Sequence, residues 1–134
     1  MAENNKSEVA PGLTEPVPDG PAATDIAAVL VYATFPSAEL AEETGRKLLE
    51  MELAACINIL PAMTSIYRWQ GAIETAQEVV LIAKTVQARA DAVTANIIAA
   101  HPYEMPAVLV IPVMGGSVSY LHWIGQEAAG RKGD

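Results

Sequence analysis

The order of strand and helix patterns predicts a domain of the α+β class. Two apolar runs, at 27–35 and 107–113, have the composition of strands that are buried on both faces. Two segments with helical spacing, at 38–53 and 90–100, follow the first run and precede the second. Between the helices, residues 55–86 hold the pattern of two further strands. The resulting βαββαβ order is that of a ferredoxin-like sandwich, here with an extended β-hairpin and a C-terminal helix.

The first strand and helix are bounded by clear signals. The run at 27–35 is apolar throughout and indicates a central strand rather than an edge. Pro36 ends it, and Ser37 can cap the helix that follows. We expect Gly45, a poor helix former, to let that helix approach the sheet closely. One face of the helix is marked by residues at steps of three and four: Leu40, Thr44, Leu48 and Met51.

The next two strands form a long hairpin. The first arm starts at residues 55–60 and should bend at Pro61, which lacks a ladder donor. It resumes at Thr64, and we place the turn at 74–77 and the returning strand at 78–86. The second helix should end at His101, because the residue before a proline avoids helical angles.

The C-terminal helix begins after a Gly-Gly turn, and Ser119 is its expected N-cap. With both main helices on one face of the sheet, the other apolar face has no cover from this chain. A surface of that kind has to be buried by something. We expect another copy of the chain to cover it, and a three-fold assembly through the hairpins would close the arrangement.

Composition limits the function of the chain. Its 134 residues suit one domain, and a net charge of −8 argues against nucleic-acid binding. Its single cysteine excludes an internal disulfide, and no apolar run is long enough to span a membrane. We interpret residues 1–25 as a disordered, acidic, proline-rich tail, 26–129 as the folded domain and 130–134 as a frayed end. Without a signal sequence, a cytoplasmic location is expected.

The sequence contains no recognisable catalytic motif, so we assign no catalytic residue and expect no enzyme. Cys56 and His101 are candidate metal ligands, because thiolate and imidazole suit copper or zinc. Cys56 is more simply interpreted as a small buried apolar residue, and His101 is also interpretable as a group that caps the helix before it. His122 is most simply a surface residue of the last helix.

Three further residue types have alternative interpretations. Tyr67 and Trp69 share a face of the hairpin and are typical of packing between subunits. Lys84 is a charge within an apolar strand and should reach a carboxylate, for which Glu104 is a candidate, unless it is simply a surface lysine.

Four segments resemble the CutA family of divalent-cation-tolerance proteins: ACINILPAMTSIYRWQG at 55–71, EVVLIAKT at 78–85, HPYEMPAVLVIPV at 101–113 and YLHWIGQ at 120–126. The resemblance covers about 27–128. It implies a ferredoxin-like protomer in a tight homotrimer, with hairpins that wrap across neighbouring copies. It also implies a role in tolerance of divalent metals, copper in particular, without an established catalytic activity.

The resemblance carries over to individual residues. Cys56 matches the cysteine of the family's ACxN segment, and His101 matches the histidine of its HPYE segment. Some bacterial members have a further cysteine and histidine where this chain has Ala33 and Ala100, so its soft ligand set is thinner. A cleft between subunits is implied for Trp69, Lys84, Tyr103 and Glu104, and would suit a small anionic or polar ligand.

The sequence therefore predicts a non-enzymatic homotrimer with weak copper or other divalent-cation binding and no required cofactor. The alternative is a trimeric small-molecule sensor that binds ligands between subunits, by analogy with nitrogen-regulatory signalling trimers. A third possibility is a scaffold role in which the acidic tail docks a partner.

Overall fold

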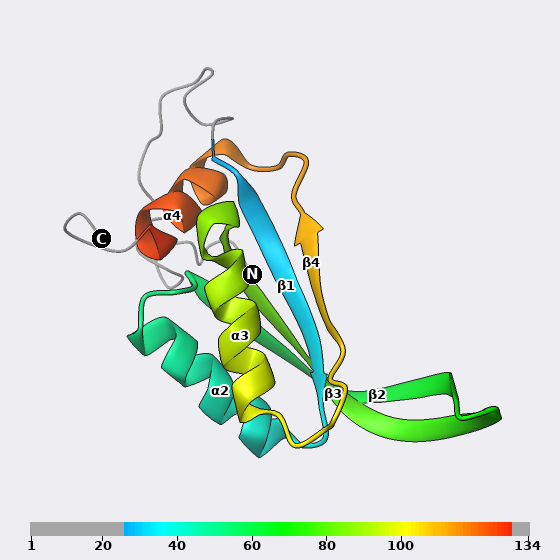
Figure 1. Ribbon diagram of the computed structural model, residues 1–134. Helices are drawn as coiled ribbons and strands as arrows, with labels where there is room; N and C mark the ends of the chain where they lie inside the picture. Colours follow the sequence, from blue (N-terminus) through cyan, green and yellow to red (C-terminus); the bar gives the residue numbers. More distant parts are fainter. Residues whose placement is uncertain (1–25, 130–134) are drawn as a thin grey trace, which may run out of the picture.

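The computed structural model describes residues 26–129, and its element order confirms the predicted α+β class and βαββαβ sandwich (Figure 1). The predicted tail at 1–25 and the frayed end at 130–134 lie outside the described residues. The elements are β1 (Ala28–Phe35), α2 (Ala38–Glu50), β2 (Cys56–Trp69), β3 (Ala72–Val86), the 3-10 turn η3 (Gln87–Arg89), α3 (Ala90–Ala100), β4 (Val108–Pro112) and α4 (Val118–Ala128).

The four strands form one antiparallel sheet in the order β2-β3-β1-β4. The predicted central position of the first strand is confirmed, because β1 pairs with β3 on one side and with β4 on the other. The two edges of the sheet are different strands, β2 and β4.

Helices α2 and α3 cover one face of the sheet (Figure 1). Side chains alternate between the faces of a strand, so every second residue of β1 points to these helices. This face supplies the main core, whose members from β1, α2 and α3 include Val29, Val31, Phe35, Leu48, Val93 and Ile97.

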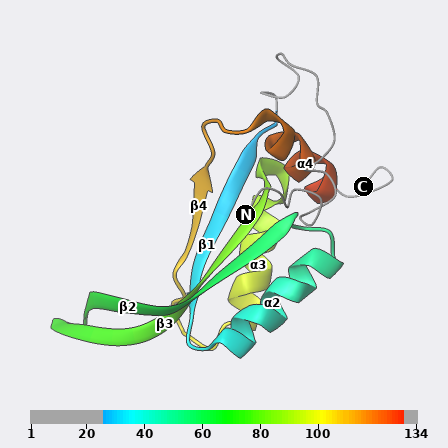
Figure 2. The same cartoon turned by 180° about the vertical axis from the view of Figure 1, so that it is seen from behind.

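The opposite face of the sheet is not covered, over most of its length, by any helix within residues 26–129 (Figure 2). Only α4 reaches it, at the end where β1 begins, through a small cluster formed by Ala28, Leu121, Trp123 and Ile124. Elsewhere the face carries exposed apolar side chains: Leu60 is 51 % exposed, Leu109 60 % and Ile111 40 %. We call this surface the helix-free face.

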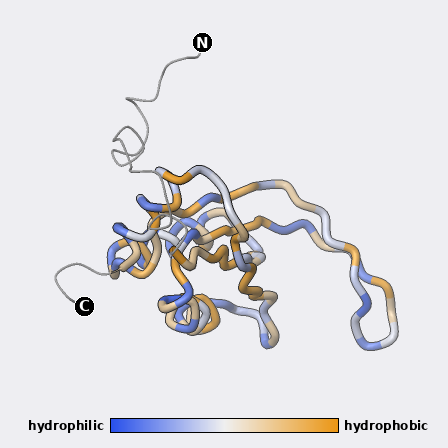
Figure 3. Tube along the Cα trace, turned by 90° about the horizontal axis from the view of Figure 1, so that it is seen from above, coloured by the Kyte–Doolittle hydropathy of each residue, from blue (hydrophilic) through white to orange (hydrophobic). Residues whose placement is uncertain are grey.

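The hairpin of β2 and β3 extends well beyond the body of the domain (Figure 3). The predicted bend at Pro61 is confirmed by a register shift between Leu60 and Met63, with Ala62 at a φ of 64°. The predicted turn at 74–77 is wrong. The chain turns at Gln70 and Gly71, whose φ angles are 50° and 84°, as a two-residue hairpin with positive φ at both positions requires.

The polar composition of residues 74–77 is explained by exposure to water and not by a turn. This part of β3 pairs with the distal part of β2 on the projecting arm, so water reaches both faces of the ladder. The polar composition therefore marks a solvated strand.

The helix boundaries mostly agree with the sequence. Ser37 caps α2, its Oγ accepting a hydrogen bond from the backbone N–H of Leu40 at 3.2 Å. The second helix ends at Ala100, directly before His101 and Pro102, as predicted. The last helix begins two residues earlier than expected, because Ser117 rather than Ser119 accepts the capping bond, from the N–H of Tyr120.

Gly45 lies where α2 touches the sheet, as its position predicted. A Cβ placed at Gly45 would lie 2.7 Å from Cγ2 of Ile57, a branched side chain of β2 that packs against the main core. Gly125 in α4 has the same spacing to Ile26, but there the nearest atom is the terminal Cδ1, which can move.

We expect Gly45→Ala to lower the free energy of unfolding. Overpacking costs about 1–3 kcal/mol, which offsets the gain of about 1 kcal/mol in helix propensity. Gly125→Ala is the matched control and should be neutral or stabilising. Urea unfolding monitored by circular dichroism measures both, and a Gly45→Ala variant at least as stable as the wild type would contradict the close approach.

Candidate functional site

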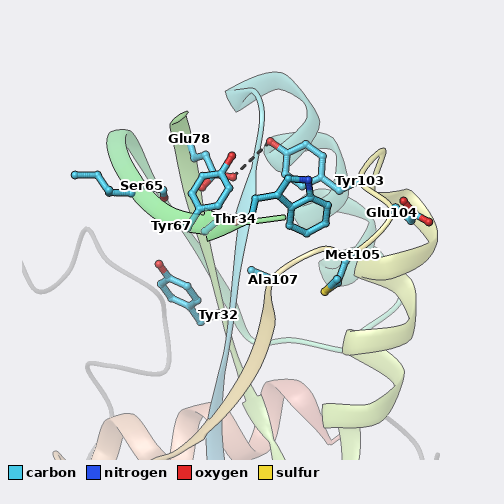
Figure 4. Close-up of a pocket in the computed structure, with 11 residues that line it drawn as sticks. Tyr32, Thr34, Ser65, Tyr67, Glu78, Tyr103, Glu104, Met105 and Ala107 are labelled. Atoms are coloured by element: carbon cyan, nitrogen blue, oxygen red, sulfur yellow. Dashed lines mark hydrogen bonds between the residues drawn. The ribbon is translucent and has the colours of Figure 1, made fainter. Parts of the chain in front are cut away.

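A pocket of about 640 Å³ opens on the helix-free face, where the hairpin bends away from the body and the loop 101–107 passes beside it (Figure 4). Four of its lining residues are aromatic and two are acidic: Tyr32, Tyr67, Trp69, Tyr103, Glu78 and Glu104. The rest are small or apolar: Thr34, Ser65, Ile66, Met105 and Ala107.

Strand alternation explains why most of these residues meet. Ser65, Tyr67 and Trp69 are two residues apart on β2, so they share one face of the hairpin. Tyr32 and Thr34 stand on the same side of β1, and Glu78 lies opposite Met63 in the ladder. The loop after α3 then adds Tyr103 and Glu104 from the other direction.

His101 anchors this loop to the sheet. Its ring lies 4.7 Å from the ring of Phe35 and 4.6 Å from that of Tyr103, measured between centroids. Its Nε2 lies 2.6 Å from the carbonyl oxygen of Thr34, and its Nδ1 accepts a hydrogen bond from the N–H of Tyr103 at 3.2 Å. A carbonyl only accepts, so Nε2 carries the hydrogen and Nδ1 the lone pair of a neutral imidazole.

Tyr103 and Glu78 form the polar centre of the pocket. The Tyr103 hydroxyl points to the Glu78 carboxylate and donates to Oε2 over a long 3.4 Å (Figure 4). Partial burial raises the pKa of Tyr103 above its usual 10.0, and the negative charge of Glu78 and the hydrogen bond to it raise this pKa further. Tyr103 is therefore a neutral donor at physiological pH.

The model of the family described as "CutA1 divalent ion tolerance protein" matches residues 29–127, which span nearly all of the described fold. The chain belongs to this family. The resemblance seen in the four sequence segments is thereby confirmed.

Individual CutA relatives agree with this assignment. Protein CutA of Mus musculus is 41% identical over 95 residues, which cover 71% of this chain and 54% of that protein, so this chain spans about half of its length. Divalent-cation tolerance protein CutA of Thermus thermophilus is 40% identical over 95 residues, covering 71% of this chain and 92% of that protein. The crystal structure of CutA1 from Shewanella sp. SIB1 has a TM-score of 0.74 at 33% identity and covers 78% of this chain and 98% of that one.

The structure brings together three of the four predicted cleft residues of this CutA1 family member. Trp69, Tyr103 and Glu104 line the pocket, but Lys84 does not. Lys84 donates to the Tyr120 hydroxyl at 3.0 Å, with its Nζ 5.1 Å from the centre of that ring. The expected Lys84–Glu104 pair is therefore not formed within this chain.

The strand register explains why Lys84 lies apart from the pocket. Lys84 pairs with Leu30, whereas the first pocket residue on β1 is Tyr32, two residues further along the strand. Two residues of strand span about 7 Å. Lys84 thus belongs to the end of the sheet that α4 covers.

The two predicted metal ligands are also apart within one chain. Cys56 is the register partner of Lys84 and packs at the margin of the α4 cluster, whereas His101 contacts Thr34. Within residues 26–129, no three His, Cys, Asp or Glu side chains are grouped closely enough to hold a metal ion. Ala33 belongs to the main core, and Ala100 is the last residue of α3.

Sequence reasoning missed Tyr32 and Glu78 as pocket residues. Both carried a usable signal, because Glu78 is a charged residue at the start of an otherwise apolar strand run and Tyr32 is a residue with a polar hydroxyl within another. In the described part of the chain, no helix has the length and apolar character needed to cross a membrane.

We expect Glu78→Gln to lower the pKa of Tyr103 toward 10.0 without bringing it below, because the carboxylate charge is removed while the burial remains. Glu104→Gln is the matched control, since Glu104 is not among the causes of the shift, and it should leave this pKa unchanged. A pH titration followed by NMR of labelled tyrosine measures both. Equal pKa values in wild type and Glu78→Gln would refute the assignment.

Proposed function

We propose that this chain acts in tolerance of divalent cations, responding to a metal ion such as copper without catalysing a reaction. The observation that carries the proposal is the family match across residues 29–127. The relative from Thermus thermophilus is named a divalent-cation tolerance protein. The sequence has no recognisable nucleophile motif, which agrees with a role that does not require catalysis. The cytoplasm is the proposed location.

In this proposal the active species is a homotrimer. The exposed apolar residues of the helix-free face favour self-association, since each large side chain buried contributes about 1.5–3 kcal/mol. The two sheet edges, β2 and β4, differ, so edge-to-edge contact joins unlike surfaces, and such contacts form a ring when the rotation between neighbouring copies closes. The projecting hairpin adds further apolar surface, with Ile66 70 % and Ile73 69 % exposed.

Cation binding in this proposal is weak, and the metal is cargo rather than a resident cofactor. One chain offers no group of three ligands within its described residues, so tight binding is not expected from it alone. His101 remains the proposed principal ligand, because its Nδ1 holds a lone pair that only the Tyr103 N–H now occupies. A copper ion would have to displace that hydrogen bond, which lowers the affinity.

We expect His101→Ala to weaken Cu(II) binding relative to the wild type, as measured by calorimetry at neutral pH. His122→Ala is the matched control, because it removes the chain's other histidine from α4 and should leave the isotherm unchanged. Cys56→Ser tests the second proposed ligand in the same way. Superimposable isotherms for wild type and His101→Ala would remove His101 from the account.

A second candidate function is that of a small-molecule sensor. The observation in its favour is the pocket of about 640 Å³, whose volume lies in the range of ordinary ligand sites. The metal role and this one use different parts of the same loop: the His101 ring for the ion, and the residues after it for the pocket.

A further inference from the structure

The pocket on the helix-free face has the chemistry of a site for an arginine side chain. Two carboxylates line it and no Lys, Arg or His does, and one of the carboxylates, Glu78, is half-buried. A carboxylate that is partly removed from water is stabilised by a cation. A guanidinium group bonds a carboxylate through two parallel N–H donors and also stacks on aromatic rings, of which this pocket holds four (Figure 4).

The cation that this pocket lacks has one candidate source, which is Arg68 on the hairpin. Lys84 and Arg89 already donate hydrogen bonds to groups of α4. Arg46 and Lys47 lie on α2, which covers the other face of the sheet. Arg68 is exposed, and its guanidinium has no hydrogen bond or ion pair to any residue within 26–129. Contact between copies through the helix-free face can therefore bring Arg68 to the pocket, but not the cations of α2.

Strand alternation turns Arg68 away from the pocket of its own chain. Tyr67 and Trp69 line that pocket, so Arg68, which lies between them, stands on the opposite face of the hairpin. This opposite face also carries Ile66 and the register partner of Arg68, Ile73, both largely exposed. We call Ile66, Arg68 and Ile73 the outer hairpin face. An arginine between exposed apolar side chains is typical of a surface that is buried between subunits.

We propose that the outer hairpin face of one copy lies on the helix-free face of its neighbour, with Arg68 in the neighbour's pocket beside Glu78. The spacing of the two surfaces agrees with this placement. Arg68 and Ile66 are two residues apart, which is about 7 Å along a strand. Glu78 is likewise two residues from Val80, the register partner of the exposed Leu60. One placement therefore joins the opposite charges and brings Ile66 to the apolar Leu60.

This inference rests on the homotrimer of the first proposal and deepens it, because it names a pair of residues that joins neighbouring copies. Each copy gives one Arg68 and receives another at Glu78, so the contact joins unlike surfaces, as a closed ring of three requires. The inference does not depend on metal binding. It competes with the second candidate function, since the guanidinium group would occupy the same pocket.

The test uses the full-length protein and reverses the two charges. Arg68→Glu places like charges together and should lower the urea concentration at which half of the trimer dissociates by at least about 0.5 M. Glu78→Arg should lower this midpoint as well. The double variant Arg68→Glu/Glu78→Arg restores opposite charges and should recover most of the loss, because residues in direct contact are not additive. Size-exclusion chromatography in a urea series measures the midpoint.

Two further variants separate the pair from other effects of charge. Arg46→Glu makes the same charge change on the exposed surface of α2 and should leave the midpoint unchanged. Arg68→Lys keeps the charge but loses the planar group that stacks on rings, so it should lower the midpoint by less than Arg68→Glu does. Circular dichroism without urea checks that each variant is folded. Arg68→Glu alone decides the matter if Glu78→Arg does not fold.

Three results would overturn the proposal. The first is a wild-type midpoint in folded Arg68→Glu. The second is a folded double variant that is no more stable than the weaker single variant. The third is an equal loss in Arg46→Glu, which would assign the effect to net charge. These results would leave the homotrimer standing, whereas a wild-type chain that is monomeric without urea would remove the homotrimer and this inference together.

Discussion

The helix-free face of the sheet is the constraint on which the rest of this molecule depends. Two helices cover one side of the four strands, and in the described part of the chain only α4 reaches the other side, where it covers one end. Apolar side chains of β2 and β4 are left facing water. Exposed apolar area of this kind is costly for a lone protomer in water, so it favours association with another copy.

The same geometry creates the pocket. The register shift after Leu60 carries the distal hairpin away from the body, and the loop after α3 returns along the gap. His101 fixes that loop through two ring contacts and two hydrogen bonds, so Tyr103 is held over the sheet. In this account His101 has a structural task in addition to its proposed use as a ligand. Metal binding there would compete with the order of the loop.

Local sequence patterns predicted much of this architecture. They placed β1 at the centre of the sheet, and they predicted the uncovered face and the close approach at Gly45. These features depend on local spacing and on the size of single residues, which a sequence displays directly. The bend at Pro61 was likewise predictable, because proline lacks a backbone donor.

The position of the hairpin turn and the partners of Lys84 were not predictable in that way. Polar residues on a solvated strand look like a turn, and the Gln70–Gly71 signal is only two residues long. An error in the turn changes the register of the whole hairpin, and register decides which side chains lie opposite one another. For that reason the pairing of Cys56 with Lys84, and the absence of Lys84 from the pocket, became visible only in the structure.

The central claim is that copies of this chain cover the helix-free face of one another. Native mass spectrometry at micromolar protein tests it most directly. The account predicts a wild-type species with three times the 14.1 kDa mass of the chain. It also predicts dissociation in Leu109→Glu, on the helix-free face, but not in Leu49→Glu, on exposed α2. A stably folded wild-type species of 14.1 kDa would contradict it.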